Sequence, residues 1–162
     1  MNPAHLHLLI NHFPIIGSLI GGFVLGYGIW SKSIQTKIAA YYVLLASTAG
    51  AVIAYLTGEG AEEIIENIQG ISKEMLDQHE DFSLISLVVI IILGIFSIIG
   101  LFLTIRKSTL SNTVAVITLL TSLVSFGLIA RTGYLGGQIR HTEINSAGTN
   151  NEQNNGEKSE TD

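Results

Sequence analysis

The sequence predicts an all-α polytopic membrane protein built as a bundle of four transmembrane helices. Of its 162 residues, 48% are apolar and only 13% are charged, and the mean hydropathy is +0.48. The charges are also segregated: residues 1–31 contain no Lys, Arg, Asp or Glu, whereas residues 59–81 hold eight of the thirteen acids. Such segregation indicates a chain divided between lipid and water.

Four uncharged stretches are long enough to cross a bilayer, which needs about 20 mostly apolar residues per helix. The predicted spans lie at about 8–30, 38–58, 82–105 and 114–137, within a single domain of residues 1–144. The third stretch has no polar face, so it fits poorly in a water-soluble bundle. Residues 145–162 contain one apolar residue, Ala147, and are expected to form a disordered polar tail.

The short loops predict the orientation of the bundle. The loop after the first span carries Lys32 and Lys37, and the loop after the third span carries Arg106 and Lys107. The middle loop has one lysine against eight acids. Because Lys and Arg favour the cytoplasmic side, we expect the N-terminus, the middle loop and the C-terminus to face the periplasm of a bacterial inner membrane.

Glycine and alanine recur on the predicted spans at the spacing that lets helices approach closely in lipid. The positions are Ala46, Gly50, Ala54 and Gly58 in the second span, and Gly17 with Gly21 and Gly22 with Gly26 in the first. These faces are suited either to packing within the bundle or to a homodimer.

Three local features are expected near the outer ends of the spans. Pro14 removes a backbone donor, so we expect a kink near His12. Residues 61–68 place isoleucines and glutamates on opposite sides and predict a short amphipathic helix on the outer membrane surface. The third helix is expected to extend outward from residue 72 and to carry His79.

With the predicted orientation, all five histidines lie at or near the outer ends of the helices. They are His5, His7, His12, His79 and His141. At a rise of about 1.5 Å per residue, His12 lies ~6 Å inside the hydrocarbon. An imidazole there needs partners for its ring nitrogens, so we expect His12 to face the bundle interior.

The composition restricts the chemistry that these histidines can support. The chain has no cysteine, which excludes disulfides, iron–sulfur clusters and covalently attached c-type haem. Two imidazoles from facing helices can hold the iron of haem b. Gly133, Gly136 and Gly137 would let a porphyrin approach the backbone, and Arg131 and Arg140 could pair with its propionates.

Two alternatives to haem stay open. The same histidines could bind zinc, copper or non-haem iron together with nearby carboxylates. Those carboxylates are Glu59, Glu62, Glu63, Glu80 and Glu143. Each histidine can also be an ordinary helix-end or loop residue, in which case the protein has a structural or assembly role without a cofactor.

Other function classes find little support. The sequence has no phosphate-binding loop, nucleophile elbow or zinc-protease motif, so an electron carrier or binding protein is favoured over an enzyme. The net charge of −5 provides no basic face for nucleic acid. The expected partners are the lipid bilayer and a respiratory or periplasmic redox protein.

Four motifs resemble those of a known family of bacterial four-helix membrane proteins. They are His7-Leu-Leu-Ile-Asn-His12-Phe-Pro14, Tyr55-Leu-Thr-Gly-Glu59, His79-Glu80-Asp81 and Gly136-Gly137-Gln-Ile-Arg140-His141-Thr-Glu143-Ile. The chain is similar, over residues 1 to about 144, to the family called domain of unknown function 2231. The resemblance implies an inner-membrane protein whose motif histidines are His7, His12, His79 and His141, and it suggests haem binding.

Overall fold

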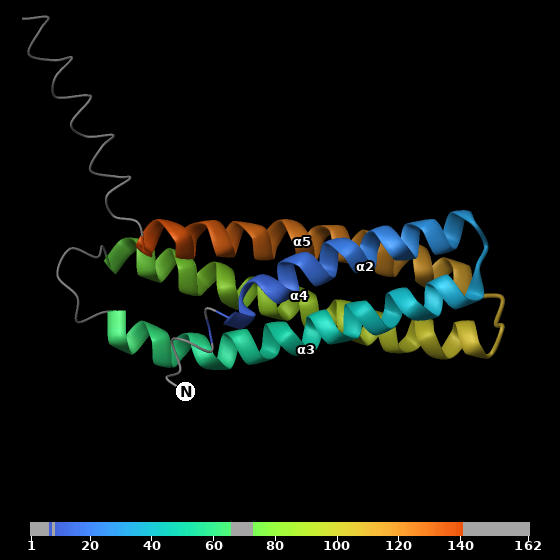
Figure 1. Cartoon of the computed structure of the whole chain (residues 1–162), viewed down its shortest axis with the longest axis horizontal. Helices are drawn as coiled ribbons and strands as arrows, with labels where there is room; N and C mark the ends of the chain where they lie inside the picture. The colour runs from blue at the N-terminus through green and yellow to red at the C-terminus, as the bar shows by residue number, and fades with distance from the viewer. Residues whose placement is uncertain (1–6, 8, 66–72, 141–162) are drawn as a thin grey trace, which may run out of the picture.

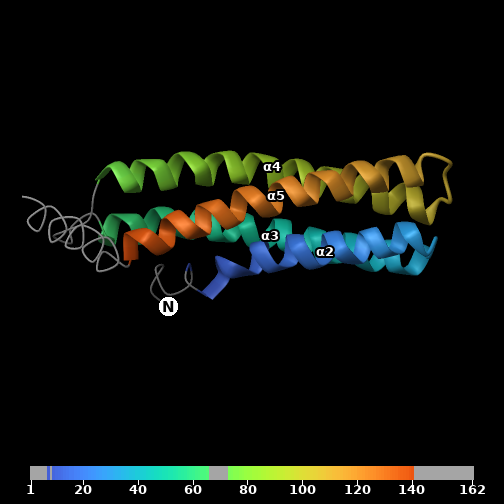
Figure 2. The same ribbon diagram turned by 90° about the horizontal axis from the view of Figure 1, so that it is seen from above.

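The computed structural model describes residues 7, 9–65 and 73–140, and these residues form a bundle of long helices. In chain order the helices are α2 (His12–Trp30), α3 (Ile34–Ile65), α4 (Lys73–Ile105) and α5 (Ser111–Arg140). They run side by side along the long axis of the molecule, each antiparallel to the next (Figure 1). The view in Figure 2 agrees, and α2 and α4 each pack against both α3 and α5.

All four helices are long and apolar enough to cross a membrane. Their outward surface carries many large apolar side chains, as expected for a surface in contact with lipid. Strongly exposed examples are Phe23, Trp30, Leu56, Ile98 and Leu120. The predicted fold class, an all-α multi-pass membrane protein, is therefore confirmed.

α3, α4 and α5 extend beyond the predicted spans, whereas α2 begins at His12, inside the predicted span 8–30. α4 begins at Lys73, so it carries His79 as expected. The prediction of a separate amphipathic helix at 61–68 is wrong for residues 61–65, because α3 continues through Ile65. The run Ala61-Glu-Glu-Ile-Ile65 has good helix formers and an established helix before it, so propagation is easier than a new start. Residues 66–68 lie outside the described part of the chain.

Both short loops lie at the same end of the bundle, which we call the lysine end (residues 31–33 and 106–110; Figure 1). Each loop has a lysine in the left-handed region, Lys32 with φ 55° and Lys107 with φ 52°. The serine after each lysine closes the preceding helix with a backbone hydrogen bond: Ser33 N–H to the Gly28 carbonyl, and Ser108 N–H to the Leu103 carbonyl. The two helix pairs thus turn by the same device, a Schellman motif with Lys in place of the usual Gly.

Lys37 is the exception to the predicted loops. It lies within α3 and is only 5% exposed, whereas the sequence suggested a loop residue. α3 begins early because Ser33 caps it: the Ser33 carbonyl accepts the Lys37 N–H, and its hydroxyl oxygen accepts the Thr36 N–H.

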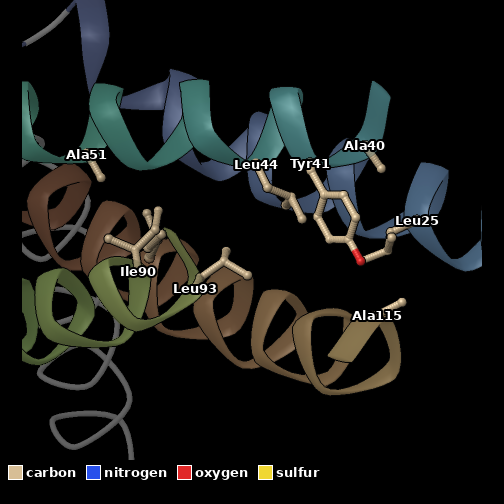
Figure 3. Packing of buried hydrophobic residues seen from close by; sticks show 9 residues of the cluster. Leu25, Ala40, Tyr41, Leu44, Ala51, Ile90, Leu93 and Ala115 are labelled. Carbon is tan, nitrogen blue, oxygen red and sulfur yellow. The ribbon is translucent and has the colours of Figure 1, made fainter. Parts of the chain in front are cut away.

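The core lies along the bundle axis, where side chains from all four helices meet (Figure 3). The cluster comprises Leu25, Ala40, Tyr41, Leu44, Ala51, Ile90, Leu93, Ala115 and Ile129. Tyr41 projects from α3 with its hydroxyl toward Leu25 of α2 and Ala115 of α5 (Figure 3).

The small residues of α2 and α3 serve contacts within the chain. A Cβ at Gly21 would lie 2.5 Å from Leu44 Cδ2, and one at Gly22 would lie 2.6 Å from Ser122 Oγ. A Cβ at Gly50 would meet the Phe13 ring at 2.6 Å. These glycines let neighbouring elements approach more closely than alanine would allow. The stripe positions Gly17, Gly21, Gly22 and Gly50 therefore lie at contacts inside the bundle, whereas Ala46 is exposed.

Candidate functional site

The candidate site lies at the histidine end of the bundle, which we define as the end holding His7, His79, Ala54–Gly58 and Thr132–Gly136. α2 begins at His12, and the Asn11 N–H before it donates to the His7 carbonyl at 2.9 Å. Pro14 thus falls in the first turn of α2, where its missing N–H leaves no helical bond unmade. This agrees with the change of chain course predicted near His12.

His12 is exposed, so the prediction that it faces the bundle interior is wrong. The buried face of α2 at this level is formed by Pro14, Gly17 and Ser18. His12 precedes Pro14 by two residues, which turns it roughly 200° away at about 100° per residue. Its Nδ1 contacts the side-chain oxygen of Asn11. The Asn11 side chain therefore supplies the polar partner that His12 was expected to find inside the bundle.

His7 contacts the last part of α3. Its Nδ1 lies 2.8 Å from the carbonyl oxygen of Ala54. Its ring lies over Gly58, where an added Cβ would be 3.4 Å from the ring Cε1. The imidazole is half-buried. The sequence resemblance, which favoured His7, thus identified an imidazole that reaches the neighbouring helix.

His79 makes the corresponding contacts between α4 and α5. Its Nδ1 lies 3.1 Å from the carbonyl oxygen of Thr132. Its ring lies over Gly136, where a Cβ would be 3.1 Å from Cε1. The Thr132 hydroxyl in turn lies 2.9 Å from the buried Ser86 hydroxyl, and it donates to the Leu128 carbonyl at 3.1 Å. A small polar network therefore supports the His79 contact.

The two imidazoles are equivalently placed in the two helix pairs. In each pair the carbonyl and the glycine are four residues apart, Ala54 with Gly58 and Thr132 with Gly136. Because a carbonyl only accepts, the Nδ1 of each ring must carry the proton. The neutral ring then has its lone pair on Nε2, which is the arrangement seen in metal-ligating histidines.

Other predicted site residues lie away from these rings. Arg131 is exposed, and its guanidinium carbon lies 5.9 Å from the Phe82 ring centre and 5.4 Å from that of Tyr134. It is therefore held on the outer surface between aromatic rings. Glu80 is exposed, and Gly137 has open space where a Cβ would stand.

Several predicted residues fall outside what the structure describes. They are the side chains of Glu59, Glu62, Glu63 and Arg140, and the whole of His5, His141 and Glu143. Within residues 7, 9–65 and 73–140, no group of three or more His, Cys, Asp or Glu is placed to hold a metal ion. The described part of the site thus contributes two imidazoles.

Sequence reasoning missed that the carbonyls of Ala54 and Thr132 orient these imidazoles, and it named Gly58 for helix packing and within a motif without assigning it to the site. A backbone carbonyl leaves no trace in residue identity. A signal did exist, however, since Tyr-Leu-x-Gly occurs at both 55–58 and 134–137, near the outer end of each second helix. The recurrence lies close to both contact glycines, but it aligns Gly58 with Gly137, whereas the glycine under the His79 ring is Gly136.

The geometry agrees with the comparison to known families. No curated protein and no solved structure matches the chain. One family model, described as a predicted membrane protein, matches residues 3–143, a range that includes all five histidines. The chain therefore belongs to the DUF2231 family of predicted membrane proteins.

Proposed function

We propose that the protein is a small haem b-binding electron-transfer protein of the bacterial inner membrane, with His7 and His79 as the axial ligands. The observation that carries the proposal is the pair of Nδ1 contacts to backbone carbonyls. They fix the same tautomer in both rings and leave the lone pair of each Nε2 free to coordinate a metal.

A two-imidazole site suits haem better than a bare ion. Haem iron needs only its axial ligands from the protein, because the macrocycle supplies the others. Zinc sites take three or four protein ligands. Within the described residues His7 and His79 are the two imidazoles that contact a neighbouring helix, and no set of three metal-binding side chains occurs. A zinc, copper or non-haem iron site would require further ligands from the acidic segment or the end of the chain.

Each residue at the site would have a defined task. The carbonyls of Ala54 and Thr132 would hold the rings in orientation, and the Ser86–Thr132 contact would stiffen the second ring. The glycines under the rings leave room for them beside the helix backbone. When bound, haem b would supply one-electron chemistry.

The proposed orientation places the histidine end at the periplasm. Lys32, Arg106 and Lys107 are exposed at the opposite end, as expected for the cytoplasmic side. Electrons would then be exchanged near the periplasmic face with a respiratory or periplasmic redox partner.

The spectrum of the purified protein tests the proposal. We expect a Soret band that is lost in His7→Ala and in His79→Ala. His12→Ala is the matched control, because its ring is exposed and bonded to Asn11, and it should keep the band. Loss of the band in His12→Ala, with retention in His7→Ala, would refute the ligand assignment.

A metal assay on the same sample separates the alternatives. If the sample contains stoichiometric metal but shows no Soret band, the proposal of haem binding is replaced by a metal-handling function. Neither haem nor metal would leave a structural or assembly role.

A further inference from the structure

The basic side chains of the lysine end have no acidic residue near them. Lys32, Arg106 and Lys107 are exposed in the two short loops, and we call these three side chains the cationic surface. No Asp or Glu occurs at residues 1–58 or 82–142, so the nearest acids along the helices are Glu59 on α3 and Asp81 on α4. At about 1.5 Å per residue, both lie more than roughly 30 Å from the loops. Because charges are screened beyond about 8 Å in physiological salt, these acids cannot neutralise the cationic surface.

The two loops belong to one surface, since both lie at the same end of the bundle (Figure 1). A hydrogen bond also joins the helices that follow them. Lys37, near the start of α3, donates from Nζ to Oδ1 of Asn112, near the start of α5, at 3.0 Å. Lys37 is only 5% exposed, so it adds a fourth positive charge beneath the exposed three. The charges of both hairpins are therefore gathered at one end.

Aromatic side chains border the cationic surface on the lipid-facing side. Trp30, the last residue of α2, is 79% exposed, and its ring centre lies 5.8 Å from that of Tyr27. On α4 the Arg106 guanidinium carbon lies 5.2 Å from the centre of the exposed Phe102 ring. Trp and Tyr favour the level of the lipid headgroups, and Lys and Arg extend their charged ends to the same level. The cations therefore lie where the apolar surface of the bundle ends.

The charge and the position of this surface together indicate its partner. Guanidinium and ammonium groups form charge-assisted hydrogen bonds with phosphate oxygens. In a zwitterionic phospholipid the headgroup's own ammonium offsets the phosphate charge, whereas an anionic phospholipid keeps a net negative charge. Clusters of Lys and Arg beside a transmembrane helix attract anionic lipids for this reason.

We infer that the cationic surface binds the headgroups of anionic phospholipids, in preference to zwitterionic ones, in the leaflet that surrounds the lysine end. The preference comes from Lys32, Arg106 and Lys107, whose charges have no acidic partner within the helices. The inference concerns only the lysine end, so it requires neither haem binding nor a particular side of the membrane.

The single tryptophan of the chain, Trp30, reports on this surface directly. Bromine atoms on a lipid's acyl chains quench tryptophan fluorescence only at short range. The full chain is reconstituted in phosphatidylcholine vesicles that contain either brominated phosphatidylglycerol or brominated phosphatidylcholine at the same mole fraction. We expect the brominated phosphatidylglycerol to quench more strongly, with a relative binding constant several-fold above one. This preference should fall at about 1 M NaCl, where the screening length is about 3 Å. Equal quenching by the two lipids would overturn the inference.

A charge-removing variant tests the assigned residues without straining the turns. Lys32→Gly and Lys107→Gly place glycine where φ is 55° and 52°, a conformation that glycine adopts without steric cost. Combined with Arg106→Gln, they should bring the relative binding constant close to one. Lys32→Arg with Lys107→Arg is the matched control, because it keeps the charge and should keep the preference. An unchanged preference in the triple variant would refute the assignment.

A second reporter position shows whether the preference is confined to the lysine end. Trp30→Phe with Tyr55→Trp moves the only tryptophan to an exposed position at the histidine end. We expect little difference between the two brominated lipids at this position, because acidic residues follow it in the chain. An equal preference for phosphatidylglycerol at both ends would contradict a surface specific to the lysine end.

Discussion

The two imidazoles at the histidine end are each held by a backbone carbonyl and a glycine of a neighbouring helix. Each ring donates from Nδ1 to a backbone carbonyl. Each ring also lies over a glycine of the neighbouring helix, in contact with the position that a Cβ would take. The contact is tighter at Gly136, at 3.1 Å, than at Gly58, at 3.4 Å. Alanine at these positions should therefore be tolerated to different degrees.

The adjacent glycines of α5 provide a matched pair for this contact. Gly137→Ala should stabilise the protein by about 0.5–1 kcal/mol, because alanine is the better helix former and the new methyl meets open space. Gly136→Ala should not show this increase in stability, because its methyl must displace the His79 ring. Thermal unfolding in detergent measures both. An equal gain at the two positions would show that the ring does not lie over Gly136.

At the scale of the helices, close packing depends on glycine at a few contacts and on one polar bond. Gly100 of α4 lies against the ring of Tyr41, which is fully buried. The Lys37–Asn112 bond joins α3 to α5 across the bundle, where the helices are not neighbours in the packing order. Each contact can be tested separately.

Gly100→Ala should destabilise the bundle by about 1–3 kcal/mol, the usual range for overpacking a well-filled core. The added Cβ would lie 2.6 Å from three atoms of the Tyr41 side chain, which is held from all sides. Gly127→Ala is the control, since nothing lies within 4 Å of its Cβ position. Equilibrium unfolding in mixed detergent gives both values, and equal stability of the two variants would contradict the packing described.

Asn112→Ala should destabilise the protein by about 0.6–2 kcal/mol, the range of interhelical hydrogen bonds in membranes. The loss leaves the buried Lys37 ammonium without its protein partner. In a Lys37→Met background the same change should have little effect, because no buried donor is left unpaired. The double-mutant cycle is measured by the same unfolding assay, and additive effects would argue against the bond.

The whole molecule is a pair of similar helical hairpins, α2–α3 and α4–α5, packed side by side. Both turn at the lysine end through a left-handed lysine, and both place an imidazole on a glycine at the histidine end. The two ends therefore differ sharply in chemistry. The orientation proposed above rests on charge, because the exposed Lys and Arg of the two short loops favour the cytoplasmic side.

The orientation can be measured directly because the chain has no cysteine. Lys32→Cys and Lys107→Cys should be labelled by a membrane-impermeant maleimide only from the cytoplasmic side. Asp77→Cys, near the start of α4, should be labelled only from the periplasmic side. Labelling of Lys107→Cys and Asp77→Cys from one side would refute both the orientation and the four-span topology.

Much of this architecture could be predicted from the sequence. Membrane spans are determined by runs of apolar residues, and an uncharged run of twenty or so residues has few alternatives to a transmembrane helix. The small-residue spacing likewise indicated close helix contacts, although the partner of each glycine was open. For the candidate site, the sequence named His7 and His79, whose rings contact neighbouring helices, but it also placed His12 inside, whereas His12 is exposed.

His12 and Lys37 show why the rest required the tertiary structure. Each is a polar residue near a helix end. Whether its side chain is buried depends on the rotation of the helix and on residues distant in sequence. His12 faces outward because Pro14 and Gly17 take the buried face, whereas Lys37 is buried because Asn112 of another helix meets it. The sequence alone determined four membrane helices and the end at which the histidines gather. Only the tertiary structure decided which imidazoles meet a carbonyl and a glycine, because those partners are backbone atoms brought close by packing.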